Sequence, residues 1–189
     1  MKNPFFTIVM VFLIVAVSGY FLKNSLREQP NVSMLNYYND ILHLDNNYIK
    51  ENRMTYSDAI GMYFCRKNNF RPIKSQSYDI GKAIMESMKK INVETKKVSV
   101  NGDVAEVEIK YDYFDTDAIY NQFPYKYTTS TDVYVERLTE KIKNNMQPVG
   151  SRKFIVKCSY DESSKKWVPE NEKIAVEDFL LAVAGYKTL

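Results

Sequence analysis

The stretch VETKKVSVNGDVAEVEIKYDY, residues 93–113, decides the fold class of this chain. Val93–Val100 and Val104–Tyr113 both have strand character, and Asn101-Gly102 between them is typical of a type I′ hairpin turn, in which both central residues take positive φ. In the second arm one face carries Ala105, Val107, Ile109, Tyr111 and Tyr113, and the other carries Glu106, Glu108, Lys110 and Asp112. This period of two predicts a strand with one buried and one solvated face.

A second pair of strands is predicted nearer the carboxyl end. Arg152–Tyr160 places Phe154, Val156, Cys158 and Tyr160 in phase on one face. Lys165–Val168 follows after the polar turn Asp161–Ser164, and Pro169 ends the pair because proline has no N–H to donate to a neighbouring strand. A mainly antiparallel sheet combined with helices predicts the α+β class.

Helical spacing of apolar residues predicts helices before, between and after the strand pairs. Before the hairpin, Asn46-Asn47 interrupts the pattern, which fits either one broken helix or two consecutive helices, and a further helix follows. The expected N-caps are Ser33, Thr55 or Ser57, Ser75 or Ser77, and Asp132. Other helices are expected at Asp115–Phe123, from Asp132 to Pro148, and at Glu177–Tyr186.

The amino-terminal stretch Phe5–Leu22, FFTIVMVFLIVAVSGYFL, carries no charge and would reach about 27 Å as a helix, close to the thickness of a bilayer core. A cleavable signal peptide would use Lys2 in its basic region and Ala16-Val17-Ser18 as its cleavage site. An uncleaved anchor is favoured slightly, because apolar residues resume at Tyr20. The anchor residues expected in the membrane include Phe5, Phe6, Phe12, Leu13, Tyr20 and Phe21.

These features divide the chain into a transmembrane anchor or signal peptide (1–22), a juxtamembrane linker (23–32) and one extracytoplasmic domain (33–189). The expected location is the cytoplasmic membrane with the domain outside it, or secretion if the first segment is cleaved. Lipid attachment is not expected, because the two cysteines, Cys65 and Cys158, are far from the apolar stretch. We expect two buried thiols rather than a disulfide, since a domain of this size folds without one.

The charged residues point to no catalytic class. Only Lys2 of the 26 Lys and Arg residues precedes residue 23, which leaves 25 against 23 Asp and Glu, too small a surplus to attract nucleic acid. The sole histidine, His43, has no partner placed for a dyad, and one histidine with two distant cysteines does not form a zinc site. Asp112, Asp115 and Asp117 lack the glycine and distal glutamate of a calcium loop. We therefore expect no enzymatic activity, metal or cofactor.

The order of helices, NGD hairpin, helix, second hairpin and short final helix resembles the small extracytoplasmic NTF2-like domains of Gram-positive bacteria. The resemblance covers about Ser33 to Gly185 and rests on the alternation after Asn101, on FIVKCSYDESSKKWVPE (154–170) and on DFLLAVAGY (178–186). It implies a curved sheet wrapped over a long helix, with a conical cavity between them. A more distant similarity is to the membrane-anchored NTF2-like subunits of conjugative secretion machines.

Four aromatic residues would face the inside of such a cone and are the candidate ligand-binding residues: Tyr111, Tyr113, Phe154 and Trp167. Aromatic residues of this kind are also typical of a packed core. The expected function is a non-enzymatic, membrane-tethered binding module for an envelope partner protein, a second copy or a small apolar ligand. The alternatives are an assembly subunit of a cell-envelope secretion or conjugation complex, and a cone-pocket isomerase or hydrolase.

Overall fold

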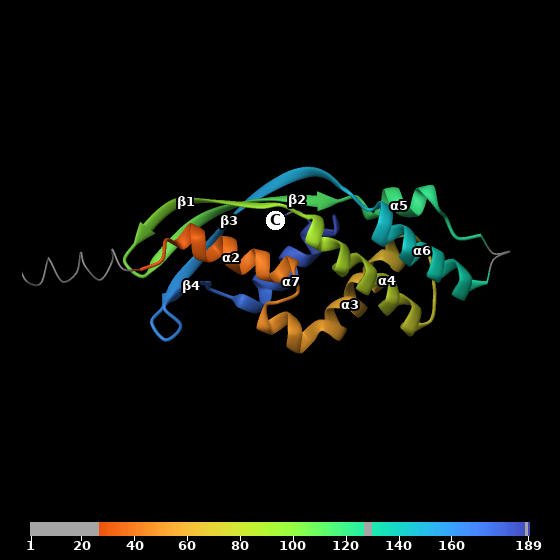
Figure 1. Ribbon diagram of the computed structural model, residues 1–189, viewed down its shortest axis with the longest axis horizontal. Helices are drawn as coiled ribbons and strands as arrows, with labels where there is room; N and C mark the ends of the chain where they lie inside the picture. Colours follow the sequence, from red (N-terminus) through yellow and green to blue (C-terminus); the bar gives the residue numbers. More distant parts are fainter. Residues whose placement is uncertain (1–26, 127–129, 188) are drawn as a thin grey trace, which may run out of the picture.

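The computed structural model describes residues 27–126, 130–187 and 189. Their elements are α2 (Pro30–Leu42), α3 (Asn47–Lys67), α4 (Lys74–Ser87), the 3-10 turn η1 (Met88–Lys90), β1 (Val93–Asn101), β2 (Val104–Phe114), α5 (Thr116–Gln122), α6 (Thr131–Asn145), β3 (Pro148–Asp161), β4 (Lys166–Pro169) and α7 (Glu172–Val183). The fold is therefore α+β, as the sequence predicts (Figure 1).

The four strands form one antiparallel sheet in the order β1-β2-β3-β4. Figure 1 shows β2 and β3 arching over the helices, which lie on one side of the sheet. The helix α2 packs against β1, β2 and β4, α7 packs against β2 and β4, and the pair α3 and α4 lies further from the sheet. The core fills the space between the concave face of the sheet and these helices.

The predicted faces of β2 and β3 are confirmed. Ala105, Val107, Ile109 and Tyr111 are all buried, and their partners on β3 include Cys158, Val156 and Phe154. On the opposite face, ion pairs join neighbouring strands, with Glu94 bound to Lys110 and Glu108 bound to Lys153, both at 3.1 Å. One face of the sheet is thus apolar and covered, and the other is charged and solvated.

The hairpin turn lies one residue later than predicted. Asn101 pairs with Val104, so the two loop residues are Gly102 and Asp103 rather than Asn101 and Gly102. A bulge at Val98 places an extra residue in β1 and shifts its register. Of the two loop residues only Gly102 has positive φ, at 62°, which matches the type II′ turn and not the predicted type I′.

Gly102→Val is expected to lower the free energy of unfolding by about 1 kcal/mol or more, because a β-branched residue resists positive φ. A Cβ at this position would meet no atom within 4 Å, so the loss comes from the backbone conformation alone. Urea unfolding measures it, with Gly102→Asn as a milder comparison, since Asn tolerates positive φ better. Equal stability of the Val variant and the parent chain would contradict the turn assignment.

The segment before the hairpin forms two consecutive helices. The first, α2, ends at Leu42, and Asn46 opens the next by accepting hydrogen bonds from the backbone N–H of Tyr48 at 2.9 Å and of Ile49 at 3.4 Å. Leu44 between them has a φ of 62°, which interrupts the helical path. The asparagine that weakens the helical pattern in the sequence is therefore the cap of the second helix.

The predicted positions of the helix starts are wrong in several places. The observed N-caps of the α-helices are Gln29, Asn46, Ile73, Asp115, Ser130 and Asn171. The residues predicted to cap lie inside helices instead: Ser33, Thr55, Ser57, Ser75, Ser77 and Asp132. Small polar residues are tolerated inside a helix where the side chain finds a partner, as Ser77 does by donating to the carbonyl of Lys74 at 2.8 Å.

The helices α3 and α4 meet in direct backbone contact. A Cβ added at Gly61 would lie 1.7 Å from the carbonyl oxygen of Ser77, and one at Gly81 would lie 1.8 Å from the carbonyl oxygen of Ser57. Each glycine sits four residues after a serine on the same helix, so the two small residues share one face. This reciprocal contact requires the absence of a side chain at both glycines.

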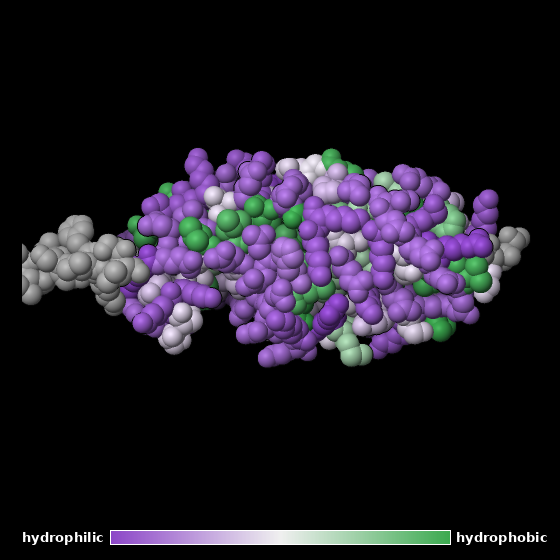
Figure 2. All heavy atoms as spheres, viewed as in Figure 1, coloured by the Kyte–Doolittle hydropathy of each residue, from purple (hydrophilic) through white to green (hydrophobic). Residues whose placement is uncertain are grey.

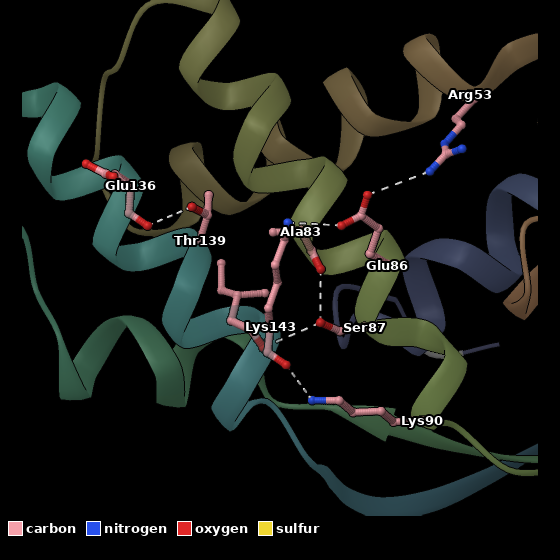
Figure 3. Close-up of polar contacts among 9 residues, drawn as sticks. Arg53, Ala83, Glu86, Ser87, Lys90, Glu136, Thr139 and Lys143 are labelled. Atoms are coloured by element: carbon pink, nitrogen blue, oxygen red, sulfur yellow. Dashed lines mark hydrogen bonds and ion pairs between the residues drawn. The ribbon is translucent and has the colours of Figure 1, made fainter.

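Polar side chains hold α4 to its other neighbours (Figure 3). Glu86 of α4 forms ion pairs with Arg53 of α3 at 3.7 Å and with Lys143 of α6 at 3.1 Å. Lys90, just after α4, donates a hydrogen bond to the carbonyl oxygen of Lys143 at 2.8 Å (Figure 3). It donates another to the carbonyl oxygen of Met146 at 3.0 Å. A cation at these last carbonyls suits the negative end of the α6 dipole and fixes where the helix ends.

Figure 2 shows a largely hydrophilic face on which apolar side chains gather over α2 and β1. The exposed apolar residues of these two elements are Val32, Val98 and Val100. Because β1 is an edge strand, the bulge at Val98 and the neighbouring Lys96 and Lys97 oppose pairing with another strand.

Within residues 27–126, 130–187 and 189, no helix is long and apolar enough to cross a membrane. The predicted anchor or signal peptide, residues 1–22 with Phe5, Phe6, Phe12, Leu13, Tyr20 and Phe21, lies outside the described residues.

Candidate functional site

Two of the predicted ligand-binding residues, Tyr111 and Phe154, lie together on the concave face. Their ring centroids are 5.8 Å apart, and Phe179 of α7 contacts Tyr111 at 5.5 Å. Tyr38 of α2 completes the group at 4.6 Å from Phe179. Tyr111 is 1% exposed, and the mutual edge contacts are those of a packed core.

The hydroxyl groups of this aromatic cluster are polar groups inside an apolar core. Burial raises the pKa of Tyr38 and of Tyr111, so both hydroxyls stay protonated at neutral pH. The hydroxyl of Tyr38 has no hydrogen-bond partner among the described residues, and the guanidinium of Arg152 lies beside the hydroxyl of Tyr111. The cluster offers apolar contact and two hydroxyl groups, but no group that changes its charge near neutral pH.

Of the other two predicted residues, Tyr113 lies two residues along β2 from Tyr111, and Trp167 lies on β4. Tyr113 is half-buried, with the guanidinium of Arg152 stacked 3.9 Å from its ring centroid. Trp167 on β4 pairs with Tyr160 at the opposite end of β3 from Arg152. Its indole N–H donates to the carbonyl oxygen of Glu28 at 2.9 Å. Trp167 is 3% exposed. Trp167 is therefore separate from the other three predicted residues.

Arg27 is held by the turns of both hairpins. Its guanidinium contacts Asp103 of the first turn at 2.6 Å and Glu162 of the second turn at 2.9 Å, and it lies 4.0 Å above the ring of Tyr160. The Arg27 side chain is 8% exposed, although both carboxylates are largely exposed. We call these four residues the Arg27 clasp.

The described part of the predicted linker 23–32 is thus fixed to the domain. Beyond the clasp, Thr95 of β1 donates to the carbonyl of Asn31 at 2.7 Å, and α2 already begins at Pro30. Residues 27–32 belong to the folded domain, because hydrogen bonds from both hairpins and the first helical turn fix them. The described residues before Ser33 therefore pack against the domain predicted for residues 33–189.

Arg27→Gln is expected to lower the free energy of unfolding by about 1–2 kcal/mol, because the change removes two ion pairs and the stacking on Tyr160. The exposed carboxylates keep the loss moderate. A double-mutant cycle with Asp103→Asn, measured by urea unfolding, should give a coupling of about 0.5 kcal/mol. Lys166→Gln, at an exposed cation on β4, serves as the control, and strict additivity of the Arg27 and Asp103 changes would contradict the clasp.

A groove that the sequence does not indicate lies at the other end of the molecule from the Arg27 clasp. Figure 1 shows the two hairpin turns at one end of the long axis and α5 and α6 at the other. There, two open hollows of about 490 Å³ each share Asn69, Phe70 and Arg71 as a common wall. We call this site the distal groove and define it by Arg66, Phe70, Arg71, Lys74, Tyr125 and Thr131.

Positive charge lines the first hollow. Arg66 and Arg71 are exposed, and neither forms an ion pair with any residue in the part of the chain that the structure describes. Lys74 is 3.7 Å from Asp58, a long contact for an ion pair between an exposed and a partly exposed side chain. The nearby Asp132 accepts a hydrogen bond from Gln76 at 2.5 Å. The two arginines therefore keep their charge available to a ligand.

Aromatic rings support the second hollow. Phe70, Tyr125 and Tyr134 contact one another with centroids 5.0 to 5.1 Å apart. Phe70 and Tyr134 are buried, whereas Tyr125 is half-buried, and its hydroxyl lies 3.3 Å from that of Thr131. Three rings that brace one another make a firm wall with one ring partly open to solvent.

Neither cysteine suits nucleophilic chemistry. Cys65 lines the first hollow but is 5% exposed, and burial raises its pKa to about 12. Burial also raises the pKa of Cys158 to about 11. A protonated thiol is a poor nucleophile and a poor metal ligand. Both cysteines are free and buried, which confirms the prediction of two buried thiols.

The other polar residues singled out in the sequence have structural partners. His43 follows α2, and its Nδ1 is 2.9 Å from the carbonyl oxygen of Asn39. Asp115 caps α5, Asp112 accepts from Ser151 at 2.6 Å, and Asp117 pairs with Lys67. Among the residues with described positions, no three His, Cys, Asp or Glu side chains cluster in a way that would hold a metal ion.

No protein-family model matches the chain, and no curated protein matches its sequence. The fold is similar to the crystal structure of YcdA from Bacillus subtilis, a candidate lipoprotein, with a TM-score of 0.59 and 14% sequence identity. The match covers 86% of this chain but only 57% of YcdA, so this chain corresponds to little more than half of that protein. At this identity the similarity establishes a shared fold and nothing more specific.

Proposed function

We propose that the protein is a membrane-tethered NTF2-like domain that binds a partner protein outside the bacterial cytoplasmic membrane, and that the distal groove is its binding site. The observation that carries the proposal is a pair of arginines, Arg66 and Arg71, that form no ion pair with any described residue and lie beside an aromatic wall, at the opposite end of the domain from the Arg27 clasp. A tether would hold the domain by its amino-terminal end and leave the distal groove accessible.

The tether and the location rest on two separate observations. Phe5–Leu22 is uncharged and long enough to span a bilayer core. The domain that follows shares its fold with a candidate lipoprotein, a class of protein attached to the outside of a membrane. The curved antiparallel sheet over helices is consistent with the NTF2-like architecture.

Binding explains the groove better than acid–base catalysis does. The charged side chains that line it are arginine and lysine, and no histidine, aspartate or glutamate is among its described lining residues. General acid–base catalysis works best with groups that titrate near the operating pH. The proposal also places the ligand in the distal groove rather than at Tyr111 and Phe154, because packed rings already fill the space around those two residues.

Site-specific photocrosslinking in living cells tests this function. A photoreactive residue replaces Met62, an exposed residue that lines the distal groove, in the full-length chain. We expect a discrete adduct with a second protein that disappears when Arg71→Glu is added. The matched control places the same photoreactive residue at Ile155, which is exposed on the outer face of the sheet. Adducts formed only from Ile155, or adducts from Met62 that persist when Arg71→Glu is added, would overturn the proposal.

A further inference from the structure

We infer that the occupant of the distal groove is an extended acidic segment of the partner protein that carries an aromatic side chain beside its carboxylates. This inference rests on the proposed function and adds the chemistry of the partner. The shared wall of the two hollows makes Arg71 available to both, whereas Arg66 and Lys74 line only the first hollow and Tyr125 lines only the second. The groove therefore has a cationic part and, next to it, an aromatic part.

The positive charge of the first hollow favours an occupant that carries carboxylate groups. Arg66 and Arg71 present planar guanidinium groups that bind a carboxylate through two parallel hydrogen bonds, and no described carboxylate occupies either of them. Asp58 lies 3.7 Å from Lys74, and Asp132 accepts a hydrogen bond from Gln76. The first hollow thus lacks the negative charge that would balance its lining.

The shape selects a segment of chain over a compact small molecule. Sites for small molecules usually enclose most of the ligand surface, whereas both hollows are open to solvent and lie on either side of the wall that Phe70 and Arg71 form. In the second hollow, the half-buried ring of Tyr125 is braced by Phe70 and Tyr134. A braced and partly open ring is a suitable surface for an aromatic side chain of the occupant.

The test uses the full-length chain in detergent micelles and a fluorescent eight-residue peptide in which Glu and Phe alternate. A second peptide of the same length replaces each Glu by Gln. We expect the acidic peptide to bind at least about tenfold more tightly than the Gln peptide, because each guanidinium–carboxylate pair is a charge-assisted hydrogen bond. This comparison uses the unaltered protein, so its result does not depend on whether a variant folds.

Protein variants then locate the site. Arg66→Gln combined with Arg71→Gln is expected to weaken binding of the acidic peptide at least about tenfold. The matched control removes the same charge from the exposed Lys96 and Lys166, which lie outside both hollows, and should change the affinity less than about twofold. Circular dichroism of both double variants verifies that they are folded.

Three results would overturn the inference. Equal affinity for the Glu and Gln peptides would remove the role of charge, and an equal loss in the Lys96 and Lys166 control would show only general attraction to a basic protein. Competition by inorganic phosphate as effective as the unlabelled peptide would identify a free anion as the ligand. A partner crosslinked at Met62 in cells, together with no binding of the acidic peptide, would reject the acidic segment and leave the proposed function standing.

Discussion

Gly61→Ala is expected to lower the free energy of unfolding by about 2–4 kcal/mol, although alanine stabilises an open helix by about 1 kcal/mol relative to glycine. The added Cβ would lie 1.7 Å from the carbonyl oxygen of Ser77. Backbone on the facing helix cannot swing away as a side chain can, so α3 and α4 must separate along their whole contact. The loss of packing between them outweighs the gain in helix propensity.

Urea unfolding followed by circular dichroism measures this loss. Gly81→Ala should cost a similar amount, since its Cβ would meet the carbonyl oxygen of Ser57 at 1.8 Å. The double variant should lose less than the sum of the two, because one separation of the helices relieves both contacts. Ser57→Ala adds no bulk and serves as the control. A stabilised Gly61→Ala variant would show that the two helices do not approach this closely.

Trp167→Ala is expected to lower the free energy of unfolding by about 3–5 kcal/mol, the usual range for removal of a large buried ring. The ring packs edge-on against Tyr160 with centroids 5.5 Å apart. Its N–H donates to the carbonyl oxygen of Glu28 at 2.9 Å, which links β4 to the chain just before α2. Loss of this ring would therefore remove a contact between the second hairpin and the first described residues.

Trp167→Phe separates the packing from the hydrogen bond. It keeps an apolar ring and leaves the carbonyl of Glu28 without its partner, so we expect a smaller loss of about 1–3 kcal/mol. Circular dichroism is the appropriate probe, because Trp167 is the only tryptophan and its removal abolishes the fluorescence signal. A loss below about 1 kcal/mol for Trp167→Ala would place the ring at the surface, where most substitutions have small effects.

The local patterns of the sequence predicted the strands well. Alternation along Val104–Tyr113 and Arg152–Tyr160 is a property of each strand alone, and the observed burial follows it. The turn was predicted one residue too early because the bulge at Val98 depends on how β1 pairs with β2. The register of two paired strands depends on contacts along both strands, so the residues of the turn alone do not determine it.

The helix starts show a similar limit. Ser33 and Asp132 are residue types that favour N-caps, yet the helices begin earlier, at Pro30 and Thr131. Ser33 instead donates a hydrogen bond to Glu28, and Asp132 accepts one from Gln76. Packing of the whole helix against its neighbours sets where the helix begins, and this outweighs the modest energy of one cap.

The distal groove was beyond sequence analysis for a related reason. Arg66–Pro72 reads along the chain as a polar connection between two helices, with no sign that its cations lack partners. Tyr125 and Thr131 come from a segment far away in the sequence and reach Phe70 only because α6 packs on α4. The one local signal, Arg66, Arg71 and Lys74 near Phe70, is too common in surface loops to mark a site.

The sequence alone determined the α+β class, the phase of the two main strands and the burial of both cysteines, because each follows from the pattern of neighbouring residues. The tertiary structure decided the register at Val98 and the close contact of Gly61 with α4. It also decided the contacts of Arg27 with both hairpin turns and the arrangement of the residues that line the distal groove. These features bring together residues that are distant in the chain, and their energies depend on distances of a few ångströms that no local pattern specifies.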